Sequence, residues 1–379
     1  MPSSAFDVAI VGAGPAGSIA ALTAAQAGLR TALVDEAVRS PRVRVGEVLP
    51  PPARWLLHRV GALRNLASGD CLVSCGTRSA WGSPSLAATD FLSSPLGPGL
   101  HLDRLAFDRA LVATASAEGV TVLGPARVTR VSRERTRWRL WIGHGSAPRP
   151  ITAHGLVDCT GRRAAIARRL GATRRADDAL VAIVTWLDSK AGTDRDTTLT
   201  VEAGPGGWWY TARLPGDTRV VGYVTDRTAP ELDVARTALG WRAFVNRTEH
   251  VREICDGHRY ELRSGPTVVS AASARLDVVA GRDWAAAGDA AASFDPVSAQ
   301  GILTAMLSGR LAARAIASRV GGDGGRGLEE YSMGLHAVYD EYLRARIRYY
   351  RLEARWPDSP FWRARWFRTN GDGGRPNAA

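Results

Sequence analysis

The pattern of apolar and polar positions changes character along the chain. Residues 6–11 form an apolar run, a helix of small residues follows over Ala16–Ala27, and a second apolar run ends at Asp35. Continuous apolar runs of this length are typical of strands in a parallel sheet that is covered on both faces. Between 103 and 162 an amphipathic helix and further strands continue this βαβ beginning.

From about 178 to 270 the pattern alternates with a period of two and is broken by turn residues, apart from a helical stretch near 233–256. This alternation predicts an antiparallel sheet inserted as a second domain. A buried strand pattern returns near 284 and leads into a helix over 299–318. An arginine- and aromatic-rich helical tail follows the glycine-rich residues 320–326.

The first strand runs directly into a G-x-G-x-x-G turn made by Gly12, Gly14 and Gly17. The first glycine permits the tight turn, the second lets the backbone approach a pyrophosphate, and the third allows close helix–strand packing. The helix N-terminus then presents its partial positive charge to the phosphates, and Asp35 can accept ribose hydroxyls. The chain is therefore predicted to bind a dinucleotide, with Ala13, Pro15 and Ala16 in the same turn.

Three further stretches indicate which dinucleotide cofactor is bound. "WAAAGDAAASFDPVSAQGI", "HLDRLAFDRAL" and "LVDCTGR" resemble the other signatures of flavoprotein hydroxylases, in the same order along the chain. The resemblance implies FAD, with Asp289 holding the ribityl chain, Arg104 near the ribityl or pyrophosphate group, and Gly161 in a turn beside the cofactor. The remaining expected FAD contacts are Arg42, Gly46, Glu47, Val128, Pro296, Gln300, Gly301 and Ile302.

The same resemblance implies a fold class and a domain division. The expected fold is α/β, with a Rossmann-like FAD-binding domain of the glutathione-reductase and p-hydroxybenzoate-hydroxylase type, an inserted antiparallel-sheet substrate domain and a C-terminal helical tail. The FAD-binding domain is expected to be discontinuous. The boundaries are 1–70, 100–170 and 271–325 for the FAD-binding domain, 71–99 and 171–270 for the substrate domain, and 326–379 for the tail.

"RVRVGEVLPPPARWLL" has a predicted strand that ends at Gly46 and Glu47, followed by leucine and prolines, and resembles the G-E-x-x-P element of flavin-dependent halogenases and related monooxygenases. Halogenases also carry a W-x-W-x-I-P motif, whose counterpart here is "GWWYTARLP" with different tryptophan spacing. Neighbouring residues on a strand point to opposite faces. We therefore expect one ring of the pair Trp208 and Trp209 to face the flavin cavity, with burial of both in the core as the alternative. Glu47, Trp208 and Trp209 are the candidate catalytic residues.

Halogenases need a lysine that positions hypohalous acid, and this chain contains one lysine, Lys190, in a polar turn. Arginine is a poor substitute because its guanidinium stays charged. The expected chemistry is hydroxylation of an electron-rich aromatic substrate through a flavin C4a-hydroperoxide. The whole chain resembles flavoprotein enzymes that hydroxylate a tryptophan of a partner protein during maturation of quinone cofactors. "RSAWGS" and the tail stretch "YYRLEARWPDSPFWRARW" are similar to segments of those enzymes.

The charge balance of +12 comes almost wholly from arginine and favours an anionic partner. An arginine-biased genome is an equally good explanation. The tail aromatics are expected either to cap the substrate domain or to form a basic rim for an acidic peptide or protein substrate. No nucleic-acid module and no transmembrane run are visible, the cysteines lack metal-site spacing, and no signal peptide precedes the first strand, so a cytoplasmic location is expected.

The electrons are expected from NAD(P)H or from a partner flavin reductase, with O₂ as the oxidant. A halogenase-like activity and a prenyl-lipid reductase or dehydrogenase activity remain as alternatives. A third alternative is a flavoprotein that docks onto a substrate complex without catalysis.

Overall fold

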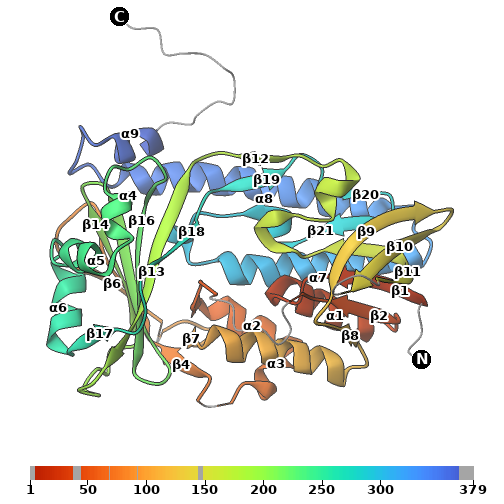
Figure 1. Ribbon diagram of the computed structural model, residues 1–379, viewed down its shortest axis with the longest axis horizontal. Helices are drawn as coiled ribbons and strands as arrows, with labels where there is room; N and C mark the ends of the chain where they lie inside the picture. The colour runs from red at the N-terminus through yellow and green to blue at the C-terminus, as the bar shows by residue number, and fades with distance from the viewer. Residues whose placement is uncertain (1–4, 37–43, 68, 92, 144–147, 367–379) are drawn as a thin grey trace, which may run out of the picture.

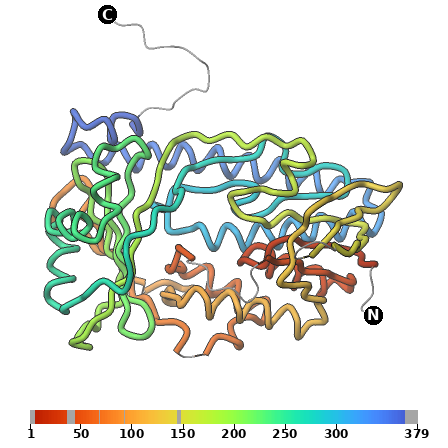
Figure 2. Tube along the Cα trace, in the orientation of Figure 1, coloured from red at the N-terminus to blue at the C-terminus, as the bar shows by residue number. Residues whose placement is uncertain are grey.

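The computed structural model describes residues 5–36, 44–67, 69–91, 93–143 and 148–366. Two large sheets lie at opposite ends of the molecule, and long helices run lengthwise beside and between them (Figure 1). Segments from the start of the chain, from residues 121–158 and from residues 280–286 lie together at one end, while residues 180–226 and 360–366 lie at the other (Figure 2). No helix in these ranges is long and apolar enough to cross a bilayer.

The first large sheet has the strand order β20-β21-β11-β1-β2-β8, and β10 and β9 continue it from β11. The pairs of β1 with β11 and β2, of β2 with β8, and of β11 with β21 are parallel, and the pairs involving β9, β10 and β20 are antiparallel. The strand bounds are β1 Ala5–Val11, β2 Thr31–Val34, β8 Thr121–Leu123, β9 Arg127–Glu134, β10 Arg137–Gly143, β11 Arg149–Asp158, β20 Ala280–Gly281 and β21 Trp284–Ala286.

Helices cover this sheet because their contact faces carry small residues. In α1, every residue from Ala16 to Ala24 is buried. Gly309 of α7 lies so close to α1 that a Cβ there would be 2.2 Å from the carbonyl oxygen of Ala16. The helices of this part are α1 Pro15–Gln26, α2 Pro51–Arg59, α3 Arg104–Ala117, α7 Gly301–Val320 and α8 Arg326–Arg351.

The second large sheet has the order β17-β13-β16-β15-β14-β5-β6, with β18 also paired to β13, and is antiparallel except for the pair β14–β5. Its strands are β5 Gly76–Ala80, β6 Ala87–Asp90, β13 Leu180–Ser189, β14 Thr198–Gly204, β15 Gly207–Leu214, β16 Thr218–Asp226, β17 Tyr260–Leu262 and β18 Thr267–Ser270. One face packs against α5, α6 and the start of α4, and the other against the end of α8 and α9. These helices are α4 Leu232–Ala235, α5 Ala238–Val245, α6 His250–Gly257 and α9 Pro360–Trp366.

Two small sheets connect the large ones. One contains β12 Arg174–Ala176, β19 Ala274–Leu276 and β22 Ala292–Ser293, and the other contains β3 Val48–Leu49, β4 Cys71–Ser74 and β7 Gly99–Leu102. Short 3₁₀ turns lie at 62–65, 161–163, 167–170, 288–290 and 296–298. The prediction of a strand that ends at Gly46 and Glu47 is wrong, because residues 44–47 are not in a strand and β3 begins at Val48. The positive φ of 99° at Gly46 turns the chain there instead.

The predicted α/β class with an antiparallel second sheet and a C-terminal helical region is confirmed. The helical stretch expected near 233–256 consists of three short helices, α4 to α6, because turn residues interrupt it twice.

Candidate functional site

The glycine-rich turn between β1 and α1 combines close backbone packing with open space where a pyrophosphate could bind. A Cβ at Gly12 would lie 2.2 Å from the carbonyl oxygen of Cys159, and a Cβ at Gly17 would lie 1.7 Å from that of Gly12. In contrast, a Cβ at Gly14 would meet nothing within 4 Å. Gly14 caps α1 and supplies no capping side chain, so the first N–H groups of the helix have no side-chain cap from this residue. The turn therefore offers backbone donors to an anion.

Asp35 follows β2 and joins this turn. Its Oδ2 accepts a hydrogen bond of 2.6 Å from the backbone N–H of Ala13. The carboxylate thus lies beside the glycine turn, at the place where a ribose would be held. The ribose contact itself stays a prediction.

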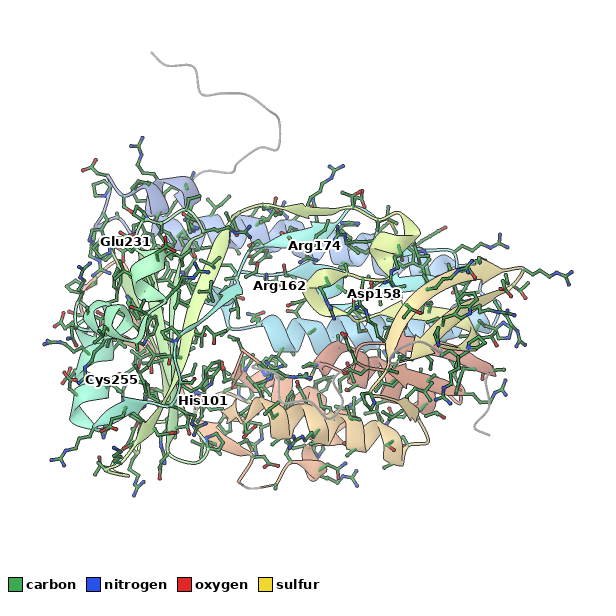
Figure 3. All side chains as sticks on the ribbon, in the orientation of Figure 1. His101, Asp158, Arg162, Arg174, Glu231 and Cys255 are labelled. Carbon is green, nitrogen blue, oxygen red and sulfur yellow. The ribbon has the colours of Figure 1, made fainter. Side chains whose placement is uncertain are left out.

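A second loop, from β11 into the 3₁₀ turn at 161–163, faces the same region and is shaped by the buried Asp158 (Figure 3). The Asp158 carboxylate accepts hydrogen bonds of 2.7–2.9 Å from the N–H and hydroxyl of Thr160 and from the N–H groups of Ile166 and Ala167. Gly161 in this loop has a φ of 67°, and a Cβ there would meet nothing within 4 Å. The loop leaves room for a ligand next to the glycine-rich turn.

Asp289 lies in the 3₁₀ turn that follows β21, and its side chain is 40% exposed. The Nε of Arg162 is 3.4 Å from its Oδ2, and Arg174 donates to its backbone carbonyl. Both arginines lie near the centre of the molecule, between the two large sheets (Figure 3). Arg162 was not among the predicted contacts, although it ends the "LVDCTGR" stretch that led to Gly161.

Arg104 begins α3 and fixes the turn at Gly46. Its guanidinium donates to the carbonyl oxygens of Val45 and Gly46 and approaches Asp108 at 3.4 Å. Glu47 follows this turn with only 3% of its surface exposed. Burial raises the pKa of Glu47 to about 7, although Arg104 and backbone N–H groups oppose that rise. A carboxyl that exchanges its proton near neutral pH is therefore held inside the molecule.

Most of these elements line one cavity of about 460 Å³, although Asp35 is not part of its lining. The cavity begins at the glycine-rich turn and continues to an apolar wall supplied by the second large sheet and by β18. The residues that line it are Gly14, Pro15, Ala16, Val45, Gly46, Glu47, Val48, Arg104, Cys159, Gly161, Arg162, Ala182, Leu199, Val201, Trp208, Tyr210, Val269, Ser270, Ala271, Ala287, Asp289, Phe294, Asp295, Pro296, Val297, Ala299, Gly301, Ile302 and Ala305.

The structure separates the two neighbouring tryptophans by the faces of β15. Trp208 lines the cavity and packs against Trp81 with a centroid distance of 6.3 Å. Trp209 stacks on Tyr223 at 4.6 Å and contacts Trp241 on the opposite face. Both rings are buried, but one of them borders the cavity and the other does not. A catalytic role for either ring stays a prediction.

A buried polar chain behind Trp208 was not visible in the sequence. The indole Nε1 of Trp208 donates to the hydroxyl of Tyr350 at 3.0 Å, and that hydroxyl donates to Oδ2 of Asp295 at 2.8 Å. Asp295 is fully buried, lines the cavity and has a raised pKa because of its burial. These three residues are far apart in the sequence, so only the fold brings them together.

Several predicted contacts lie elsewhere. Val128 packs in the core of the first sheet, and Gln300 is exposed before α7, so neither lines the cavity. Gly12, Ala13, Gly17 and Asp35 are not in the lining either, although they belong to or contact the turn that borders it. Arg42 lies outside the described residues. Cys159 lines the cavity, but burial raises the pKa of its thiol well above the ordinary value and keeps it protonated.

The tail packs against the second sheet. Phe361, Trp362 and Arg365 of α9 are buried, and Trp362 donates to the carbonyl oxygen of Gly204 at 2.9 Å. Arg365 pairs with Asp226. These contacts favour the capping interpretation of the tail aromatics.

The residues fit FAD, because the open glycine positions Gly14 and Gly161, the first residues of α1 and two arginines line one cavity. The comparisons agree with this assignment. The FAD binding domain family matches residues 5–345. LodB of Marinomonas mediterranea, which is assigned as an FAD-dependent oxidoreductase, is 27% identical over 367 residues, covering 95% of this chain and 96% of LodB.

Two solved structures extend the comparison. The flavin-dependent halogenase CmlS matches with a TM-score of 0.83 and 26% identity, over 95% of this chain and 67% of CmlS. QhpG, a peptidyl tryptophan dihydroxylase, matches with a TM-score of 0.73 and 22% identity over 97% of this chain and 80% of QhpG, which shows a shared fold. With its family match over most of the chain and a cavity built for the cofactor, this FAD-dependent oxidoreductase belongs to the FAD binding domain family.

Proposed function

We propose that the protein is an FAD-dependent monooxygenase that hydroxylates an aromatic side chain, in particular tryptophan, of a peptide or protein. Reduced FAD supplies the activation of O₂ when it is bound, and NAD(P)H or a partner flavin reductase supplies its electrons. The observation that carries the proposal is the composition of the cavity, in which an apolar wall faces the flavin end and no lysine is present among the lining residues.

The absence of lysine from the lining argues against halogenation. The chain has one lysine, Lys190, whose side chain is 73% exposed and lies 2.6 Å from Glu261 on the surface. Lys190 directly follows β13 and is not among the residues that line the cavity. Arg104 and Arg162 do line the cavity, but a guanidinium stays charged and is a poor carrier for hypohalous acid.

The far wall of the cavity suits an aromatic side chain. Ala182, Leu199, Val201 and Val269 present aliphatic surface beside Trp208 and Tyr210. Aromatic rings bind such walls through burial and edge or offset contacts. The exclusion of water by this wall also favours oxygen transfer over wasteful release of peroxide.

The choice of a peptide tryptophan as substrate is supported by a structural relative. QhpG is a peptidyl tryptophan dihydroxylase with the same fold, and the match to LodB covers 95% of this chain and 96% of LodB. An acidic peptide would also complement the positive net charge of the chain, although six of the eight arginines between 326 and 366 pair with carboxylates.

The test uses the FAD-loaded protein, chemically or photochemically reduced, with isotopically labelled O₂ and tryptophan-containing peptides of neutral and acidic sequence. The expected result is a peptide that gains one labelled oxygen on the indole, as shown by mass spectrometry. Peptides with phenylalanine in place of tryptophan are the control. Release of all reducing equivalents as peroxide with every aromatic peptide, or reduction of a prenyl lipid instead, would refute the proposal.

A further inference from the structure

Two cavities meet at Glu47 and Arg104. The flavin-side cavity of about 460 Å³ has both residues in its lining, and so does a second cavity of about 300 Å³. No other residue is shared by the two linings. The second cavity, here called the outer cavity, is also lined by Trp186, Arg263 and Ser264, of which the last two are exposed. The outer cavity therefore reaches solvent, while Glu47 stays buried between the two spaces.

The Glu47 carboxyl interacts with the backbone of Gly46 and with the indole of Trp186, which also lines the outer cavity. Its Oε2 accepts a hydrogen bond of 2.9 Å from the N–H of Gly46, and its Oε1 is buried without a hydrogen-bond partner among the described residues. Burial of an unpaired carboxyl oxygen is costly unless a ligand, a water molecule or a proton satisfies it. An oxygen of this kind in the wall between two cavities is placed for exchange of a proton.

We propose that Glu47 transfers protons between the outer cavity and the flavin-side cavity, a role that rests on the oxygenase function proposed above. The charged and titratable groups around it come from several elements. Arg104 of α3 and Arg44, which pairs with Asp108, are the nearby cations. Trp186 of β13 and Tyr210 of β15 also interact with Glu47. Burial holds the pKa of Glu47 at about 7, so the carboxyl can both release and regain a proton near neutral pH.

The reaction requires such a proton. An aromatic substrate AH, O₂, an anionic reduced flavin FADH⁻ and one proton give AOH, oxidised flavin and water. One proton therefore enters from solvent in each turnover. The Glu47 carboxylic acid would release it into the flavin-side cavity, and the resulting carboxylate would regain one from water in the outer cavity.

Other groups in the two linings are less suited to this transfer. Arg104 remains charged throughout the physiological pH range. Asp295 lines only the flavin-side cavity, and its two oxygens already accept from the N–H of Val297 and the hydroxyl of Tyr350. Asp103 lines only the outer cavity, where it caps α3.

The first experiment needs neither substrate nor turnover. Infrared difference spectra of the protein are recorded while pH is raised from about 5 to about 9. A protonated carboxyl band that disappears with a midpoint near 7 is expected. It should be absent from Glu47→Gln and present in Asp103→Asn, and its persistence in Glu47→Gln would overturn the assignment of the titrating group.

The second experiment follows the reaction of the reduced FAD-loaded protein with O₂ in ordinary and deuterated water. In Glu47→Gln, proton-dependent reoxidation should slow on the order of 10²-fold and lose its dependence on pH, because the amide cannot release a proton. Glu47→Ala should regain part of its rate when acetate is added, since a small carboxylic acid can enter the space that is left. FAD affinity is measured for each variant to separate this effect from loss of the cofactor.

Ser264→Trp provides a second variant that leaves Glu47 intact. The indole should fill the outer cavity and slow reoxidation, with a larger solvent isotope effect, whereas Leu239→Trp on an exposed surface outside both cavities should change neither. Unchanged reoxidation in both Glu47→Gln and Ser264→Trp, with FAD still bound, would refute the proton path. If Glu47→Gln and Ser264→Trp both slow reoxidation as expected but no aromatic peptide is hydroxylated, the proposed function is refuted and the proton path stands.

Discussion

Replacement of Glu47 by glutamine should stabilise the protein at high pH, because the native carboxyl is buried at a cost. The pKa of Glu47 rises from 4.5 to about 7 on folding. A group with a raised pKa in the folded state contributes stability that is fully present below about pH 4.5 and is lost as pH rises through about 7. The difference of about 2.5 pKa units corresponds to about 3 kcal/mol.

Glutamine is uncharged at every pH, retains an oxygen that can accept from the N–H of Gly46, and has nearly the same volume. The stability of Glu47→Gln relative to the native protein should therefore increase by about 3 kcal/mol between about pH 5 and about pH 8. For 379 residues, the entropy of unfolding is about 0.8 kcal/mol per kelvin. The melting temperature of the variant should thus gain about 4 °C over that of the native protein across this pH range.

The assay is thermal unfolding of both proteins at fixed FAD concentration, followed by circular dichroism at several pH values. Glu202→Gln is the matched control, because Glu202 is also buried but accepts from the N–H groups of Glu249, His250 and Val251 at the start of α6. That change should lower stability by about 1–3 kcal/mol at about pH 8. A stability difference for Glu47→Gln that does not change with pH, or a loss at high pH, would refute the reasoning.

Three further predictions concern the cavity. Gly14→Ala should leave unfolding of the FAD-free chain nearly unchanged but weaken FAD binding in a fluorescence titration. Gly12→Ala should impair folding itself, because its Cβ would overlap the backbone carbonyl of Cys159, directly after β11. Tyr350→Phe removes one hydroxyl with two buried partners and should lower the free energy of unfolding by about 2–4 kcal/mol in denaturant titrations, and an effect below about 1 kcal/mol would contradict the polar chain. Asp158→Ala removes the acceptor for three backbone N–H groups and should weaken FAD binding through disorder of the loop at Gly161, visible as faster amide exchange there.

The cofactor-binding part of the protein could be predicted from the sequence because its determinants are local. The glycine turn at Gly12–Gly17, the acid at Asp35 and the Gly288–Asp289 turn each lie within a few residues of a strand end, and backbone geometry restricts which residues can occupy such turns. The change from continuous to alternating apolar positions along the chain likewise indicates a parallel sheet followed by an antiparallel one.

Residues that act through long-range contacts could not be predicted in this way. Trp208, Tyr350 and Asp295 meet only because β15, α8 and the loop before α7 converge, and adjacent Trp208 and Trp209 differ in environment because helices cover both faces of the second sheet. The raised pKa of Glu47 is also a tertiary property. Desolvation depends on every element that surrounds the carboxyl, while the residues next to it in the sequence supply only backbone hydrogen bonds, which lower the pKa.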